Sequence, residues 1–229
     1  MYLILCAMKE EVSEIIEKID VKEKYKFFGM DFFRGILCNQ ETIVGMTGVG
    51  KVMAAIVTQK MIDVFSPKKI IFAGIAGCLS NDIDIGDIVI STDTIQHDMD
   101  ASALGFKIGE IPYTGIRFIE ADPEMINIAK KFKADNCKVI PGRILTGDRF
   151  VSASKPEERI FLAKEMGGHA VEMEGAAAAL TAKMNNIPFL IIRVISDKSD
   201  GKAPADFHNF LGKSSKLIAE MVLHIIGNA

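Results

Sequence analysis

The sequence lacks the features that identify nucleic-acid-binding, membrane and secreted proteins. Its 27 lysines and arginines against 30 aspartates and glutamates give a net charge of −3, with both signs mixed throughout. No basic stripe is available to neutralise phosphates, so we expect no nucleic-acid partner. No apolar run approaches the roughly 20 residues that span a bilayer, so we expect no membrane partner. Met1–Met8 is apolar but has no basic n-region and leads directly into Lys9, which favours a first strand in a cytoplasmic protein over a signal peptide.

Cysteine and histidine are both scarce and scattered. The four cysteines and four histidines show no CxxC or other metal-ligand spacing. His97–Asp100 is polar and follows a predicted strand, and we interpret it as a loop. We therefore expect reduced, mostly buried thiols, no metal ion and no cofactor.

The chain contains no Pro-, Gly- or Ser-rich stretch, no long like-charge run and no repeat that would mark a linker. At 229 residues a chain buries roughly 70% of its unfolded surface, which is enough for a sizeable core. We expect one domain over residues 1–229.

Short β-branched apolar runs alternate with segments of helical spacing. The predicted strands are Tyr2–Cys6, Lys69–Phe72, Asp87–Ser91, Arg143–Leu145 and Phe189–Ile195, with a hairpin of Phe32–Leu37 and Thr42–Thr47. Helical patterns follow Met8 and Asp122-Pro123, and recur over Gly175–Met184 and about Phe207–Ile226. This order predicts an α/β fold, with a mixed central β-sheet flanked by helices on both faces.

Ligands of such sheets bind beyond the carboxyl ends of the strands. Several segments at the ends of the predicted strands hold unusual side chains. Glu172 and Glu174 come at the end of a buried strand, where carboxylates are costly without partners. Arg193 lies inside an apolar run, where it is costly for the same reason. Gly74–Gly77 and Gly48–Gly50 follow other strands, and their glycines permit close backbone approach. We expect a site at this edge.

The sequence matches two phosphate-binding motifs only in part. Gly45–Lys51 fits the first seven positions of a P-loop, but Val52 stands where a hydroxyl would hold Mg²⁺. The dinucleotide fingerprint fails because Met53 occupies the position of its third glycine. A tight turn leading into a helix, with Val49 at the rim of a cleft, is the simpler interpretation.

The carboxylates suit cleavage of a glycosidic bond. One carboxyl group protonates the leaving group, another activates water, and negative charge stabilises an oxocarbenium-like sugar. Asp197, Glu174 and Glu11 fit these requirements, and Phe150, Met173 and Phe207 offer flat or polarizable surface for a base and a ribose. Cys78 has no histidine beside it, which argues against nucleophilic acyl transfer.

Six motifs carry a resemblance over nearly the whole chain. They are Ala7-Met-Lys-Glu-Glu11-Val, Gly48-Val-Gly-Lys51, Ile85-Gly-Asp-Ile-Val-Ile-Ser91, His97-Asp98, Val171-Glu-Met-Glu174 and Arg193-Val-Ile-Ser-Asp197. The sequence thereby resembles the 5′-methylthioadenosine/S-adenosylhomocysteine nucleosidases of the purine nucleoside phosphorylase superfamily. The resemblance implies a nucleoside phosphorylase-like fold and hydrolysis of adenine nucleosides to adenine and a 5′-thio-ribose, or of 5′-deoxyadenosine.

The resemblance also implies roles for individual residues. Asp197 would protonate adenine N7 with help from Ser196, Glu174 would hold the ribose hydroxyls, and Glu11 would activate water. The other substrate-binding residues would be Met8, Val49, Phe150, Val151, Glu172, Met173, Arg193 and Phe207. A homodimer is implied, with Ala101, Leu104 and Pro112 of the neighbouring subunit completing the 5′-thio pocket. Ile75 stands where the family has a serine, so a hydroxyl contact is lost.

Three alternatives remain at this stage. A nucleoside phosphorylase would need arginines near Glu11 and Gly74 to bind phosphate, and the sequence has a glutamate and Ile75 there. An aminofutalosine hydrolase would share the base and ribose contacts and differ only in the 5′ pocket. A non-catalytic nucleoside-binding protein would not need three carboxylates.

Overall fold

The computed structural model describes residues 1–151, 156–198 and 203–229, without the side chains of residues 156, 203–209 and 211. The strands are β1 Tyr2–Cys6, β2 Asp20–Phe27, β3 Met30–Leu37, β4 Gln40–Met46, β5 Lys69–Cys78, β6 Ile88–Gln96, β7 Ile119–Glu120, β8 Val139–Thr146, β9 Ala170–Glu172 and β10 Phe189–Asp197. The helices are α1 Lys9–Lys18, α2 Lys51–Phe65, α3 Pro123–Ala129, α4 Pro156–Ile160, α5 Gly175–Met184 and α6 Ala203–Gly227, with short turns η1 Ser102–Leu104 and η2 Phe161–Glu165.

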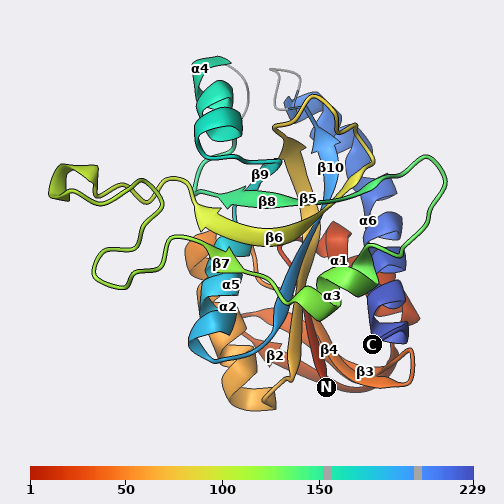
Figure 1. Ribbon diagram of the computed structural model, residues 1–229. Helices are drawn as coiled ribbons and strands as arrows, with labels where there is room; N and C mark the ends of the chain where they lie inside the picture. Colours follow the sequence, from red (N-terminus) through yellow and green to blue (C-terminus); the bar gives the residue numbers. More distant parts are fainter. Residues whose placement is uncertain (152–155, 199–202) are drawn as a thin grey trace.

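The strands form one mixed sheet, part of which closes on itself (Figure 1). Strands β10, β6, β8, β9 and β5 follow one another around a ring, because β10 also pairs with β5. Strands β1, β4, β3 and β2 extend the sheet from β5, and β7 pairs with β6. The predicted fold class, α/β with a mixed central sheet, is confirmed; closure of the ring is a feature that the sequence pattern did not indicate.

The sheet forks along β5. The pairing of β1 with β5 ends at Phe72, and the pairing of β9 with the same edge of β5 begins at Gly77. On the opposite edge, β10 pairs with β5 from Ile70 to Gly77. The backbone between Phe72 and Gly77 is therefore open on one edge, and the segments that follow β1 and β9 meet there.

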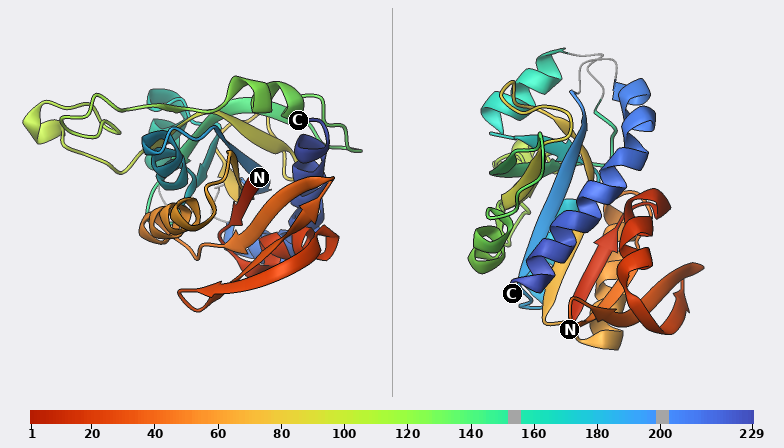
Figure 2. Two further views of the ribbon diagram at one scale, coloured as in Figure 1. Left: turned by 90° about the horizontal axis from the view of Figure 1, so that it is seen from below. Right: turned by 90° about the vertical axis from the view of Figure 1, so that its right-hand side faces the viewer.

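Helices cover the sheet on two sides, as the views in Figure 2 show. On one side α2 packs against α5, whose run of small residues is almost entirely buried. On the other side α6 packs along β10 and against α1 and α3. The α1 helix buries Val12 and Ile15, the apolar stripe that its sequence predicts, and this anchors its first turn beside the fork.

Some predicted boundaries were wrong. Gly74–Gly77 does not follow a strand but continues β5, because its backbone pairs with β10. Strand β2 was not predicted, because most of its side chains are exposed and charged, and Glu23 interrupts the apolar alternation of Val21, Tyr25 and Phe27. The hairpin turn is also tighter than expected: Cys38 and Asn39 both have positive φ, and β4 begins directly after them.

A long arm between β6 and β7 projects from the body of the molecule (Figure 1). It carries exposed apolar side chains, of which Leu104 is 70% exposed and Tyr113 is 89% exposed. Within the residues that the structure describes, no helix is both long enough and apolar enough to cross a membrane.

Candidate active site

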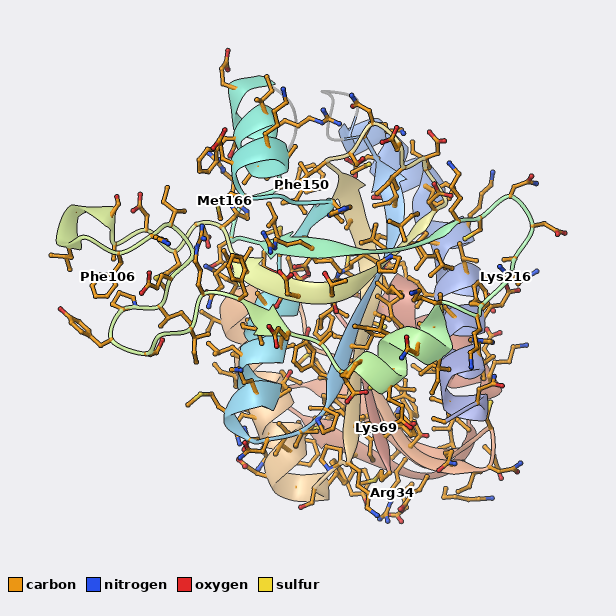
Figure 3. All side chains as sticks on the ribbon, viewed as in Figure 1. Arg34, Lys69, Phe106, Phe150, Met166 and Lys216 are labelled. Atoms are coloured by element: carbon orange, nitrogen blue, oxygen red, sulfur yellow. The ribbon has the colours of Figure 1, made fainter. Side chains whose placement is uncertain are left out.

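A cleft with a cavity volume of about 140 Å³ lies at the fork. Ten of the predicted site residues line it: Met8, Glu11, Val49, Phe150, Val151, Glu172, Met173, Glu174, Ser196 and Asp197. Figure 3 labels Phe150 at the end of the molecule where β5 and β10 terminate. The arrangement follows the rule for strand ends, because the segments after β1, β4, β8 and β9 contribute, together with the last two residues of β10.

Glu11 is buried and firmly held in the first turn of α1. Its Oε2 accepts the backbone N–H groups of Ala7 and Met8, each at 2.9 Å, and its Oε1 accepts that of Ile75 at 2.9 Å. A carboxylate has about four acceptor sites, so roughly one is left for the cleft. The Ile75 amide lies in the unpaired stretch of β5, so the contact needs no side-chain hydroxyl at this position.

Gly74 allows a carboxylate and a guanidinium to approach the backbone of β5. A Cβ at Gly74 would lie 2.2 Å from Arg193 Nη1 and 2.5 Å from Glu11 Oε1, so any larger residue would displace both. Burial raises the pKa of Glu11, although Arg193 and the three amides favour the ionised form. A raised pKa makes the ionised carboxylate a stronger base, which suits it to accept a proton.

Arg193 lies behind the cleft and not in its lining. Its side chain is fully buried, its Nη2 pairs with Glu172 and lies 3.6 Å from Glu174 Oε2, and its guanidinium lies over the ring of Phe72. Burial alone would lower the pKa of Arg193, but Glu172, Glu174 and Glu11 outweigh it and raise the pKa. One cation therefore stands among three carboxylates.

Glu172 reaches the cleft but is largely occupied by partners within the protein. Its carboxylate accepts the backbone N–H groups of Glu174 and Gly175 and hydrogen bonds from Thr146 and Arg193. It thus caps the N-terminus of α5, where a negative charge is stabilised by the helix dipole. This geometry positions Glu174, the next carboxylate along the chain.

Glu174 faces both the cleft and the turn before α2. Its Oε1 accepts the backbone N–H of Gly50 at 2.8 Å. Burial, followed by the charge of Glu172, raises the pKa of Glu174 to about 7, against the opposing effect of Arg193. Gly50, with φ of 97°, adopts a conformation that favours glycine, and its role was not predicted.

Ser196 and Asp197 end β10 and are both buried. The Ser196 hydroxyl lies 2.9 Å from Asp197 Oδ2 and 3.3 Å from the carbonyl oxygen of Ala76. A hydroxyl has one proton, so it donates to one of these acceptors at a time. The contact with Ser196 fixes the orientation of the Asp197 carboxyl group in the cleft.

Apolar side chains form the remaining walls. Val49 and Phe150 are 52% and 45% exposed and stand at the rim, while Met8 and Met173 line the interior. The side chain of Phe207 lies outside the described residues. Within one chain Ala101, Leu104 and Pro112 belong to the arm and do not line the cleft.

Residues that sequence reasoning missed act mainly through the backbone. The amides of Gly50 and Ile75 bind the two candidate catalytic glutamates, and amide contacts leave no signature in residue type. Thr146 donates a hydrogen bond to Glu172, and no sequence motif marks this threonine. Over residues 1–151, 156–198 and 203–229, no three His, Cys, Asp or Glu side chains are grouped so as to hold a metal ion.

The chain is similar to known proteins over nearly its whole length. Residues 2–227 match the model of the phosphorylase superfamily. The 5′-methylthioadenosine/S-adenosylhomocysteine nucleosidase of Staphylococcus haemolyticus is 35% identical over 97% of each chain. The aminodeoxyfutalosine nucleosidase of Helicobacter pylori is 36% identical over 97% of this chain and 96% of its own.

A solved structure extends the similarity to three dimensions. A mutant of the Helicobacter pylori nucleosidase, with 5′-methylthioadenosine in its active site, superposes with a TM-score of 0.93 at 35% identity, over 100% of this chain and 98% of that one. The chain therefore belongs to the 5′-methylthioadenosine/S-adenosylhomocysteine nucleosidase family of the phosphorylase superfamily, and is an N-glycosyl hydrolase.

Proposed function

We propose that this enzyme hydrolyses 5′-methylthioadenosine and S-adenosylhomocysteine to adenine and the corresponding 5′-thio-ribose. The observation that carries the proposal is Glu11, a buried carboxylate that lines the cleft with one acceptor site left after three backbone hydrogen bonds. This carboxylate lies in the same cleft as Asp197 and Glu174, which are the groups that a glycosidic cleavage requires.

Asp197 acts as the general acid in this proposal. It protonates N7 of adenine, so that the base leaves as a neutral molecule while positive charge develops on the sugar. Ser196 holds the carboxyl group in place. Phe150 stacks on the adenine ring and the backbone of Val151 binds its edge, which orients N7 toward Asp197.

Glu174 binds the sugar, and Glu11 acts on the water that attacks it. Glu174 accepts hydrogen bonds from the ribose hydroxyls, with Met173 beneath the ring, and its charge stabilises the oxocarbenium-like transition state. Glu11 accepts a proton from the attacking water. Arg193 limits the repulsion among the carboxylates from behind the cleft. The 5′-thio group lies against Met8, Val49 and Phe207.

A phosphorylase reaction on the same fold is disfavoured by charge. Glu11 and a phosphate anion about 4 Å apart would repel by roughly 4 kcal/mol at an effective dielectric constant near 20. Arg193 does not reverse this repulsion, because it is already paired with Glu172 and Glu174. Water is the nucleophile that this lining admits.

Aminodeoxyfutalosine is the second candidate substrate, because a nucleosidase of that name is 36% identical to this chain. Its base and ribose would use the same contacts, and its larger 5′ group would extend past the exposed rim at Val49. The test is a comparison of kcat/KM for 5′-methylthioadenosine, S-adenosylhomocysteine, 5′-deoxyadenosine and aminodeoxyfutalosine. A preference for aminodeoxyfutalosine by more than an order of magnitude would reject our first choice.

We also propose a homodimer, in which the arm of one subunit completes the 5′-thio pocket of the other through Ala101, Leu104 and Pro112. The arm exposes Leu104, and α2 exposes Val52 and Ile56. Large exposed apolar surface marks an interaction site.

We propose further that residues 1–229 act as one domain in the cytoplasm. The match over residues 2–227 supports the first point, and the four free cysteines, which form no disulfide, suit a reducing compartment.

A further inference from the structure

A cluster of charged residues lies just outside the cleft, at the start of α2. Lys51 Nζ lies 2.6 Å from Asp98 Oδ1 and 3.7 Å from Asp148 Oδ2. The three residues come from separate parts of the chain, because Asp98 follows β6 at the base of the arm and Asp148 follows β8. The Lys51 side chain is only 16% exposed and that of Asp98 is 33% exposed, so solvent screens this ion pair less than an ordinary surface pair, while Asp148 is half exposed.

Backbone amides tie the cluster together. Asp148 Oδ1 accepts the N–H of Lys51 at 2.9 Å, and Asp98 Oδ2 accepts the N–H of Asp148 at 2.8 Å. Asp98 therefore uses one oxygen for the Lys51 ammonium group and the other for the backbone after β8. Burial would raise the pKa of Asp98, but the hydrogen bonds from Lys51 and Asp148 outweigh it and lower the pKa.

The cluster reaches the candidate site through a single glycine. Gly50 directly precedes Lys51, and its N–H donates to Glu174 Oε1 at 2.8 Å. Gly50 has a φ of 97°, a backbone conformation that is held in place by the contacts of the adjacent residues. Since Asp148 holds the next amide along the chain, the position of the Gly50 N–H is set by the cluster.

We propose that Asp98 is a positioning residue of the nucleosidase reaction. By fixing Lys51 and Asp148, it holds the Gly50 amide against Glu174 and so aligns the Glu174 carboxylate with the ribose hydroxyls. None of the three charged residues lines the cleft, so the effect is transmitted through the backbone. The proposal rests on the ribose-binding role of Glu174 proposed above.

The test is a kinetic comparison of full-length Asp98→Asn, Lys51→Met and Lys51→Arg with the wild type, on 5′-methylthioadenosine and on its analogue without the 3′-hydroxyl. Asp98→Asn keeps the shape of the side chain but loses its charge. We expect KM for 5′-methylthioadenosine to rise about tenfold in Asp98→Asn and Lys51→Met, which is the scale of one charge-assisted hydrogen bond. We expect little change in kcat, and Lys51→Arg should restore KM because it donates to both aspartates.

Two readouts separate positioning from general destabilisation. The analogue has already lost a contact to Glu174, so its KM should rise less than that of the parent substrate. In a Glu174→Gln background, Asp98→Asn should have no further effect. The matched control is Asp93→Asn, which removes an ion pair with Arg143 elsewhere on β6 and should leave KM unchanged.

Unchanged KM in Asp98→Asn, or equal increases for substrate and analogue, would overturn the positioning role. Failure of the wild type to release adenine from 5′-methylthioadenosine would instead overturn the proposed substrate. The same variants would then be measured on aminodeoxyfutalosine, whose ribose presents the same hydroxyls.

Discussion

Replacing Glu11 by glutamine preserves the size of the side chain and removes its ability to take a proton. The carboxylate now accepts three backbone N–H groups, two on Oε2 and one on Oε1. An amide has one oxygen and one NH₂ group, so it cannot accept on both sides. If its oxygen faces Ala7 and Met8, its NH₂ group faces the N–H of Ile75.

The variant therefore loses at least one buried hydrogen bond and places two hydrogen-bond donors against each other. An unsatisfied buried donor costs about 1–3 kcal/mol, and a chain of this size loses about 2–4 °C in melting temperature per kcal/mol. The loss of the general base is larger, because it typically lowers the rate by about 10²–10⁴-fold. We therefore expect a modest fall in melting temperature and a severe fall in kcat.

Asp87→Asn is the matched control for the structural part of this effect. Asp87 is also buried and accepts two backbone N–H groups, those of Asp84 and Lys138, but it does not line the cleft. It should lower the melting temperature comparably and leave kcat nearly unchanged. The assay is release of adenine at saturating substrate below both melting temperatures. If Glu11→Gln kept kcat within about tenfold of the wild type, well short of the loss of a general base, the role of Glu11 would be refuted.

Three further predictions follow from the site and the arm. Asp197→Asn should abolish turnover, a loss of at least about 10²-fold, while 5′-methylthioadenosine still binds in calorimetry; near-normal adenine release would exclude Asp197 as the acid. Burial raises the pKa of Glu174 from 4.5 to about 7. Ionisation of Glu174 therefore destabilises the folded enzyme increasingly as the pH rises from 4.5 to about 7. Binding of the ribose hydroxyls favours the ionised form. The Kd of 5′-methylthioadenosine for Asp197→Asn should therefore fall as the pH rises through 7, and a flat profile from pH 6 to 8 would contradict this role of Glu174. Leu104→Asp should shift the sedimentation coefficient toward that of a monomer and weaken activity; a fully active wild-type monomer at assay concentration would reject the homodimer.

The sequence predicted the parts of the fold that depend on apolar patterning. The buried strands β1 and β10 and the helix α5 were predicted close to their observed bounds, because their side chains record burial directly. The exposed strand β2 was missed because only Tyr25 and Phe27 pack against the core, which leaves too short an apolar alternation to recognise. Closure of the ring through β10 and β5 depends on sheet curvature, which no local pattern encodes.

In the candidate site, too, the sequence predicted what side-chain type reveals and missed what depends on the backbone and the fold. Glu172, Glu174 and Arg193 were identified because charged side chains in apolar surroundings require partners, and the structure brings them together. The amides of Gly50 and Ile75 could not be identified, because every residue type except proline carries an N–H group. The Lys51, Asp98 and Asp148 cluster joins three distant segments whose proximity depends on the fold.

The nature of the nucleophile is the most direct test of the account. Purified enzyme would be incubated with 5′-methylthioadenosine in the absence and presence of excess phosphate, and the sugar product identified by mass spectrometry. We predict adenine and a free reducing 5-methylthioribose, formed at the same rate in both conditions. A ribose 1-phosphate product, or a rate that rises with added phosphate, would contradict the assignment of Glu11 as the base that activates water.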